Sequence, residues 1–150
     1  MSGIFGFTLR SADEALMADA LGGLEYWNRI YGRQGTDKRT LDNSAIGCHV
    51  EHFSDRYPWG GPILEHEGRL AVVDALLYNR EELLPQLSLD AECGISDEEL
   101  LLRLFLERGS KALASVNGDF AGAVFDPNTK EWTLFRDHLG IRPLYFYRDR

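Results

Sequence analysis

Residues 117–145 read NGDFAGAVFDPNTKEWTLFRDHLGIRPLY, and they decide the fold class of the chain. Two short apolar runs, 120–126 and 132–136, flank the turn-forming residues PNTK at 127–130. Apolar runs joined by such a turn predict an antiparallel pair of strands. A further apolar and aromatic run at 143–147 extends the series. We therefore expect the last third of the chain to consist of antiparallel strands.

The rest of the chain alternates between strand-like and helix-like segments, which excludes the all-α and all-β classes. We expect strands at 3–9, 44–53 and 70–73, and loops at 32–43 and 56–68. Three pairs with capping-box spacing, Ser11/Glu14, Asn79/Glu82 and Ser96/Glu99, predict helices at 12–31, at 80–87 and from residue 97 to the position before Gly109. The Gly22-Gly23 pair inside the first helix indicates either a bend or a close neighbour.

Composition limits the possible functions of this 150-residue chain, which has the size of a single domain spanning 1–150. Its net charge of −8 argues against nucleic acid and against a polybasic membrane contact. No apolar stretch reaches membrane-helix length and no secretory signal is visible, so we expect a cytoplasmic protein. Cys48 and Cys93 are too few for a disulfide framework, and we expect two thiols. Although Cys48, His49 and His52 are zinc-ligand types, strand alternation separates Cys48 from His49, and we assign no metal site.

Three stretches together resemble the class-II glutamine amidotransferase domain of asparagine synthetases. Residues 117–126 and 136–145 match the family's Asp-Gly-Met-Phe-Ala-Phe-Ala-Leu-Trp-Asp and Arg-Asp-Arg-Leu-Gly-Ile-Lys-Pro-Leu-Tyr. The opening MSGIFG resembles Met-Cys-Gly-Ile-Phe-Gly, and Tyr78-Asn79, Glu82-Leu83 and Ser96-Asp97 follow at family-like distances. The resemblance covers nearly the whole chain.

The resemblance implies an α+β fold, a four-layer α/β/β/α sandwich of antiparallel sheets known as the N-terminal-nucleophile hydrolase fold. Family members continue beyond the position of Arg150 with another strand and then with an ATP-dependent synthetase domain. We therefore expect the sandwich to be truncated at its C-terminal strands, and we expect the synthetase domain as a downstream partner. ATP and Mg belong to that domain, and we expect no cofactor in this chain, which has no phosphate-binding loop.

In the resembling family, removal of Met1 exposes a cysteine whose thiol attacks the side-chain amide of glutamine while its α-amino group relays the proton. Ser2 stands at this nucleophile position, and hydroxyl groups are weaker acids than thiols. Where the family reads Asn-Gly-Glu-Ile-Tyr-Asn, this chain has Asp74 and Ala75 in place of the oxyanion-donating amide and its glycine. An ionised Asp74 would repel an oxyanion.

Two further positions concern the grip on glutamine. The family's arginine that binds the substrate carboxylate aligns with GCHVE at 47–51, which contains no arginine. Asp97 matches the residue that holds the substrate's α-amino group, and its neighbour Ser96 is independently expected as a helix cap. These changes imply a degenerate glutaminase-type domain with Ser2, Asp74, Ala75 and Asp97 at the vestigial site.

Three readings stay open at this point. The leading one is a structural platform for an ATP-dependent amide-forming domain, as in the β-lactam synthetases and lasso-peptide cyclases. The alternatives are an active glutamine amidotransferase that uses Ser2, and a freestanding binding module. The sheet edge left by a missing strand would favour a homodimer. We expect Arg136-Asp137-His138 to form a surface or interdomain ion pair, and we expect exposed aromatic residues, if present, to mark a docking face.

Overall fold

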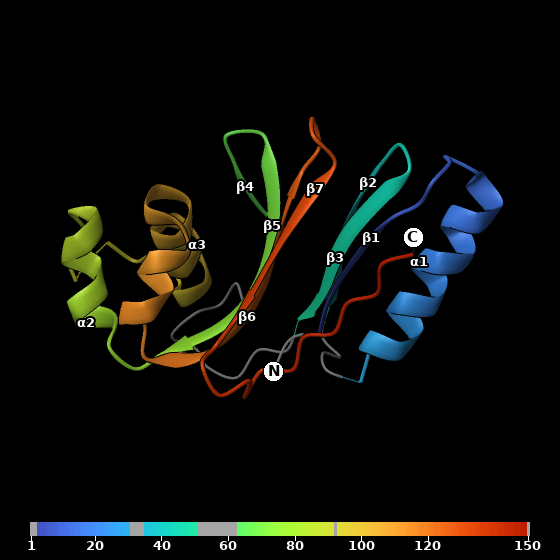
Figure 1. The fold of residues 1–150 in the computed structure, drawn as a ribbon. Coiled ribbons are helices and arrows are strands. Elements are labelled where there is room, and N and C mark those ends of the chain that lie inside the picture. Colours follow the sequence, from blue (N-terminus) through green and yellow to red (C-terminus); the bar gives the residue numbers. More distant parts are fainter. Residues whose placement is uncertain (1–2, 31–34, 51–62, 92, 150) are drawn as a thin grey trace.

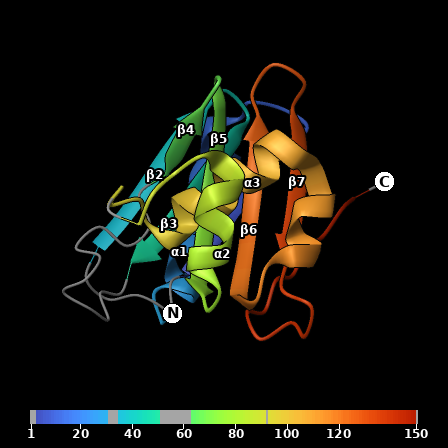
Figure 2. The same ribbon diagram turned by 90° about the vertical axis from the view of Figure 1, so that its left-hand side faces the viewer.

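A computed structural model describes residues 3–30, 35–50, 63–91 and 93–149 of the chain. Two antiparallel sheets lie face to face between helices, in four layers (Figure 1). One sheet has the order β1-β3-β2 and is covered by α1, while the other has the order β4-β5-β6-β7 and is covered by α2 and α3 (Figure 2). The expected four-layer α+β sandwich is confirmed for the described residues.

The elements follow one another along the chain with short connections. The first sheet comprises β1 (Gly3–Thr8), β2 (Gly35–Leu41) and β3 (Ser44–Val50), and the second comprises β4 (Leu64–His66), β5 (Arg69–Leu77), β6 (Gly118–Asp126) and β7 (Glu131–Arg136). The α-helices are α1 (Glu14–Asn28), α2 (Arg80–Leu83) and α3 (Asp97–Arg108), and two 3₁₀ segments, η1 (Leu84–Leu87) and η2 (Gly109–Ser115), follow α2 and α3. In this part of the chain no helix is both long and apolar enough to cross a membrane.

Strand β5 supplies both layers of the core because its side chains alternate between two faces. Leu70 and Val72 pack between the sheets with Ile46 and Phe125. Ala71, Val73 and Leu77 face the helices and pack with the leucines of α3. The register that pairs Asp74 with Ala121 and Ala75 with Phe120 fixes which of these residues faces the other sheet.

The helix and hairpin predictions of the second half are confirmed. Ser96 caps α3 by accepting a hydrogen bond from the Glu99 amide at 3.2 Å, and the helix ends before Gly109 as expected. The 127–130 turn joins β6 and β7. For α1 the predicted cap is wrong, because Asp13 and not Ser11 accepts the hydrogen bond from the Leu16 amide.

The loop prediction at 32–43 is wrong for residues 35–41, which form β2. This strand reads GTDKRTL and is largely exposed, so it has no apolar alternation to reveal it. Its structure comes from backbone pairing with β3, and polar side chains are typical of such an edge. The predicted strand at 143–147 is also wrong, because those residues form no sheet pairing. Leu64–His66, predicted as loop, forms the short strand β4.

Gly22 and Gly23 lie in the exposed interior of α1, and a Cβ at either position would have no atom within 4 Å outside the helix backbone. Neither glycine is therefore explained by close packing. Replacing either by alanine should stabilise the protein by about 0.5–1 kcal/mol, because glycine loses more backbone entropy in a helix. Urea unfolding of the single variants measures this gain, and a loss of stability in both would contradict it.

Candidate functional site

A cavity of about 250 Å³ opens beside the first strand, next to the position that follows Ser2 in the sequence. Its walls come from four parts of the chain: residues 3–6 of β1, Leu24 and Asn28 of α1, Asp74 and Ala121 of the second sheet, and residues 142–145. Ser2 itself lies outside the described residues. The cavity therefore adjoins the predicted nucleophile position and contains one predicted site residue, Asp74.

Asp74 forms a buried ion pair in this cavity. Its carboxylate oxygen Oδ2 lies 3.2 Å from Nη1 of Arg142, and the side chains of Arg142 and Asp74 are only 15% and 10% exposed. Charges held in such a poorly hydrated place are stabilised by their partner, and removing either partner leaves an uncompensated charge. A carboxylate that accepts from a guanidinium has no proton to donate to an oxyanion.

The backbone around Arg142 is fixed by Asp137, which is buried. Its Oδ1 accepts from the amides of Leu139 and Ile141 at 3.0 and 2.9 Å, and its Oδ2 accepts from the amides of Arg142 and Phe120 at 3.0 and 3.3 Å. The expected surface ion pair at 136–138 is thus wrong for Asp137, whose acceptors are used by backbone amides. This loop aims Arg142 at Asp74.

Ala75 and Asp97 lie on the other side of the second sheet from the cavity. Ala75 packs against the helix-side core, because it follows Asp74 on the strand and so faces the opposite way. Asp97, the first residue of α3, accepts from the Leu77 amide at 2.8 Å and from Arg80 Nη1 at 2.8 Å. Neither residue lines the cavity, so the structure does not bring them together with Asp74 in one pocket.

A third carboxyl group on α3 lies within electrostatic reach of Asp74 and Asp97. Burial raises the pKa of Glu98, hydrogen bonds from its own amide and from Ser96 oppose this, and the charges of Asp97 and Asp74 raise the pKa further. Within the described ranges, no group of three His, Cys, Asp or Glu side chains is arranged to hold a metal ion.

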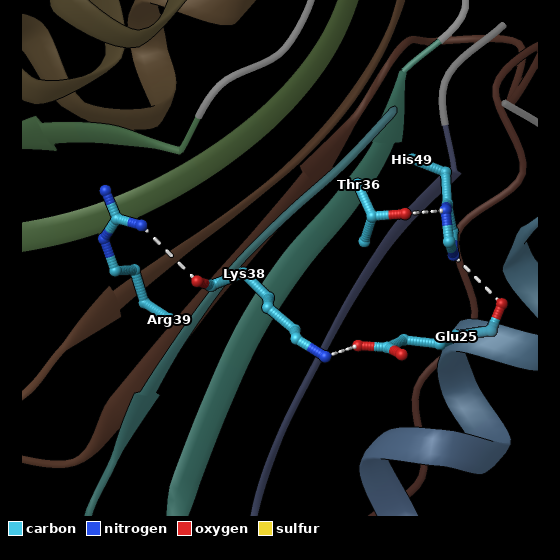
Figure 3. Close-up of polar contacts among 5 residues, drawn as sticks. All are labelled: Glu25, Thr36, Lys38, Arg39 and His49. Carbon is cyan, nitrogen blue, oxygen red and sulfur yellow. Dashed lines mark hydrogen bonds and ion pairs between the residues drawn. The ribbon is translucent and has the colours of Figure 1, made fainter. Parts of the chain in front are cut away.

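His49 occupies the strand where the resemblance placed the substrate-gripping arginine, and it makes structural contacts (Figure 3). Its Nε2 donates to the carbonyl oxygen of Glu25 at 2.9 Å, so its neutral ring accepts at Nδ1 from the Thr36 hydroxyl at 2.8 Å. The Glu25 carboxylate also pairs with Lys38. These contacts fasten α1 to the first sheet.

Comparison with known sequences identifies the family. A profile described as a glutamine amidotransferase domain matches residues 60–150, more than half of the chain. The chain belongs to the glutamine amidotransferase domain family. It is 35% identical over 134 residues to the glutamine-hydrolyzing asparagine synthetase B of Escherichia coli (strain K12), covering 75% of this chain and 24% of that protein. The four-layer sandwich described above is the fold that this family implies.

Two further relatives show the breadth of the similarity. The putative glutamine-hydrolyzing asparagine synthetase 2 of Methanocaldococcus jannaschii is 31% identical over 107 residues, which cover 71% of this chain and 20% of that protein. The amidase chyE of Penicillium rubens is 32% identical over 129 residues, which cover 82% of this chain and 19% of that protein. The chain thus spans at most about a quarter of the length of these curated relatives.

The motif residues that this amidotransferase domain shares with its family hold the backbone together. Asn79 accepts from the Asn117 amide at 2.9 Å and donates to the Ser115 carbonyl at 2.9 Å, which ties the end of β5 to the start of β6. Asp97 and Asp137 likewise accept from backbone amides. Motif retention in this domain is therefore explained by the fold.

Arg142 is the cavity residue for which sequence reasoning assigned no role. The only signal in the sequence is its place in the IRPLY motif, where the family reads Lys. Nothing in the spacing of residues 74 and 142 indicates that they pair, because the contact joins positions 68 apart through the tertiary fold.

The two thiols of the amidotransferase domain should differ sharply in reactivity. Burial, with a smaller contribution from the charge of Asp37, raises the pKa of Cys48 to about 12, whereas Cys93 is exposed. Because the thiolate is the reactive form, we expect a thiol reagent at neutral pH to modify Cys93 alone in the folded protein. Denaturant should release the second thiol. Rapid modification of Cys48 without denaturant would contradict this.

Proposed function

We propose that this chain is a glutaminase-type domain that does not hydrolyse glutamine and that serves as a platform for an ATP-dependent amide-forming domain. The single observation that carries the proposal is the buried ion pair between Asp74 and Arg142. It stands where the family resemblance expects an amide that donates to the oxyanion. Losing one such donor typically costs about 10²–10³ in rate, and a carboxylate in its place adds repulsion.

The geometry of the other positions supports the same proposal. His49 is used in fastening α1, and Ala75 faces the helix-side core. Asp97, the position that matches the holder of the α-amino group, is engaged by Leu77 and Arg80. The retained residues thus have structural partners, which is what we expect of a domain kept for its shape.

Exposed aromatic residues support a docking role. Trp27 is 71% exposed, and Tyr145, Phe146 and Tyr147 are 90%, 79% and 89% exposed. Aromatic side chains are enriched in interfaces because they bury a large area at low entropic cost. We propose that they contact a downstream synthetase domain, as the greater length of the curated relatives suggests. ATP and Mg would bind to that domain and not to this one.

We also propose a cytoplasmic location, since both cysteines carry thiols. A second candidate function is glutamine hydrolysis by Ser2, and it is favoured by the names of the asparagine synthetase relatives, which are glutamine-hydrolyzing. The two candidates differ in one measurable product.

The deciding experiment measures glutamate release from glutamine by the natural full-length protein and by its Ser2→Ala variant. Our proposal predicts no release above the Ser2→Ala background, while the amide-forming reaction with ATP proceeds without glutamine. Glutamate release by the unmodified protein that disappears in the variant would overturn the proposal and establish a serine-dependent glutaminase.

A further inference from the structure

The guanidinium of Arg142 has fewer partners than it has donors. Guanidinium groups carry five N–H donors and no acceptor. Nη1 lies 3.2 Å from Asp74, but Nε is shielded from solvent and has no hydrogen-bond partner within the described structure. A buried donor of a charged group without an acceptor is costly, so the side chain is suited to one further acceptor.

We propose that Arg142 is the carboxylate-recognition residue of the cavity and that the cavity binds small carboxylates of amino-acid size. The inference deepens the proposed function, because it assigns to the same site a ligand that is held without being hydrolysed. It gives Arg142 the task that the family assigns to an arginine on another strand, at a position where this chain has none.

The chemistry of the walls favours this ligand class. A guanidinium offers paired N–H donors whose spacing matches the two oxygens of a carboxylate. At about 250 Å³ the cavity falls below the roughly 300–1,000 Å³ of sites for drug-sized molecules. Asp74 places a negative charge beside Arg142, which disfavours dianions such as phosphate and leaves a monoanion or a zwitterion as the fitting ligand.

The side chain is also held in place before any ligand binds. The Asp137 carboxylate accepts the Arg142 amide, and the ion pair with Asp74 restrains the guanidinium at the other end. Recognition groups fixed in this way lose little entropy on binding.

The test is calorimetric titration of the natural full-length protein with three probes. L-Glutamine has both an α-carboxylate and an α-ammonium group, glutaramate lacks the ammonium group, and 4-aminobutanamide lacks the carboxylate. We expect glutamine and glutaramate to bind and 4-aminobutanamide to show no binding. Arg142→Lys, which keeps the charge but removes the fork, should weaken the carboxylate probes by about tenfold or more.

Two variants guard against misfolding and against general charge effects. The double variant Asp74→Asn/Arg142→Gln removes both charges of the pair together, and it should keep the far-ultraviolet circular dichroism of the parent while losing glutaramate binding. Arg69→Lys alters an arginine paired with Asp126 away from the cavity, and it should leave the affinity unchanged.

Three results would overturn the proposal: no binding of either carboxylate probe, equal affinity for glutaramate in the parent and in Arg142→Lys, or binding of 4-aminobutanamide as tight as that of glutaramate. Glutamate release during the titration would instead overturn the absence of hydrolysis, and the affinities of the Arg142 variants for unreactive glutaramate would still decide the role of Arg142.

Discussion

Replacing Asp137 by alanine is expected to lower the free energy of unfolding by about 3–5 kcal/mol, because a buried acceptor of several hydrogen bonds is lost. Its carboxylate accepts from four backbone amides, those of Phe120, Leu139, Ile141 and Arg142. Without it these amides lack acceptors, and the loop that carries Arg142 loses its anchor. Urea unfolding at neutral pH measures the loss.

The effect should depend on pH in a defined direction. Burial tends to raise the pKa of Asp137, but hydrogen bonds from the amides of Arg142, Ile141, Phe120 and Gly140 outweigh it and hold the pKa below its usual value. A carboxyl group with a lowered pKa in the folded state stabilises the protein above its unfolded-state pKa, and this contribution disappears as pH falls through the folded-state pKa. The stability difference between parent and variant should therefore shrink in acid.

Asp137→Asn provides the matched control for this prediction. Asparagine keeps the size and one carbonyl oxygen but replaces the second acceptor by a donor that faces backbone amides. Its stability should be closer to that of the alanine variant than to that of the parent at neutral pH. Equal stability of Asp137→Ala and the parent at neutral pH would show that the loop is held by other contacts.

Replacing Asp97 by alanine is expected to cost about 2–4 kcal/mol of folding stability, although the residue matches a substrate-binding position. The carboxylate joins three elements, since it begins α3, accepts from the Leu77 amide at the end of β5 and pairs with Arg80 of α2. Its removal leaves both a buried amide and a largely buried guanidinium without this acceptor. Thermal and urea unfolding of the purified variant test the value.

Glu99→Gln is the comparison variant for Asp97, because both acids lie in the first turn of the same helix. The Glu99 carboxylate pairs with Arg103 one turn later at a partly exposed site. Such a pair contributes about 0.3–0.5 kcal/mol, so this variant should be nearly as stable as the parent. Similar small losses in both variants would assign Asp97 a role outside folding.

Sequence patterns predicted the elements whose side chains carry the signal. The core helix α3 was predicted with its cap, because Ser96 and Glu99 have capping-box spacing and the leucines follow a helical period. The β6–β7 hairpin was predicted from two apolar runs and a turn. In contrast, β2 depends on a neighbouring strand for its structure, and polar residues such as Lys38 and Arg39 give no periodic signal.

The candidate site was predictable only in part. Asp74 was found because the family motif assigns a role to its position, and strand alternation explains why it faces the first sheet while Ala75 faces the helices. Arg142 was missed because a contact between distant residues depends on how the loop after β7 folds back. The strand expected at 143–147 did not form because apolar composition cannot supply the backbone pairing that a strand requires.

The alternation along β5 has a consequence for how the chain folds correctly. Shifting β5 by one position relative to β6 would turn the Asp74 carboxylate toward the leucines of α3 and expose the alanines and valines to the wrong layer. Such a misaligned intermediate would bury an unpaired charge, which is strongly disfavoured. The residue that removes a donor from the cavity thus also protects the central strands against register errors during folding.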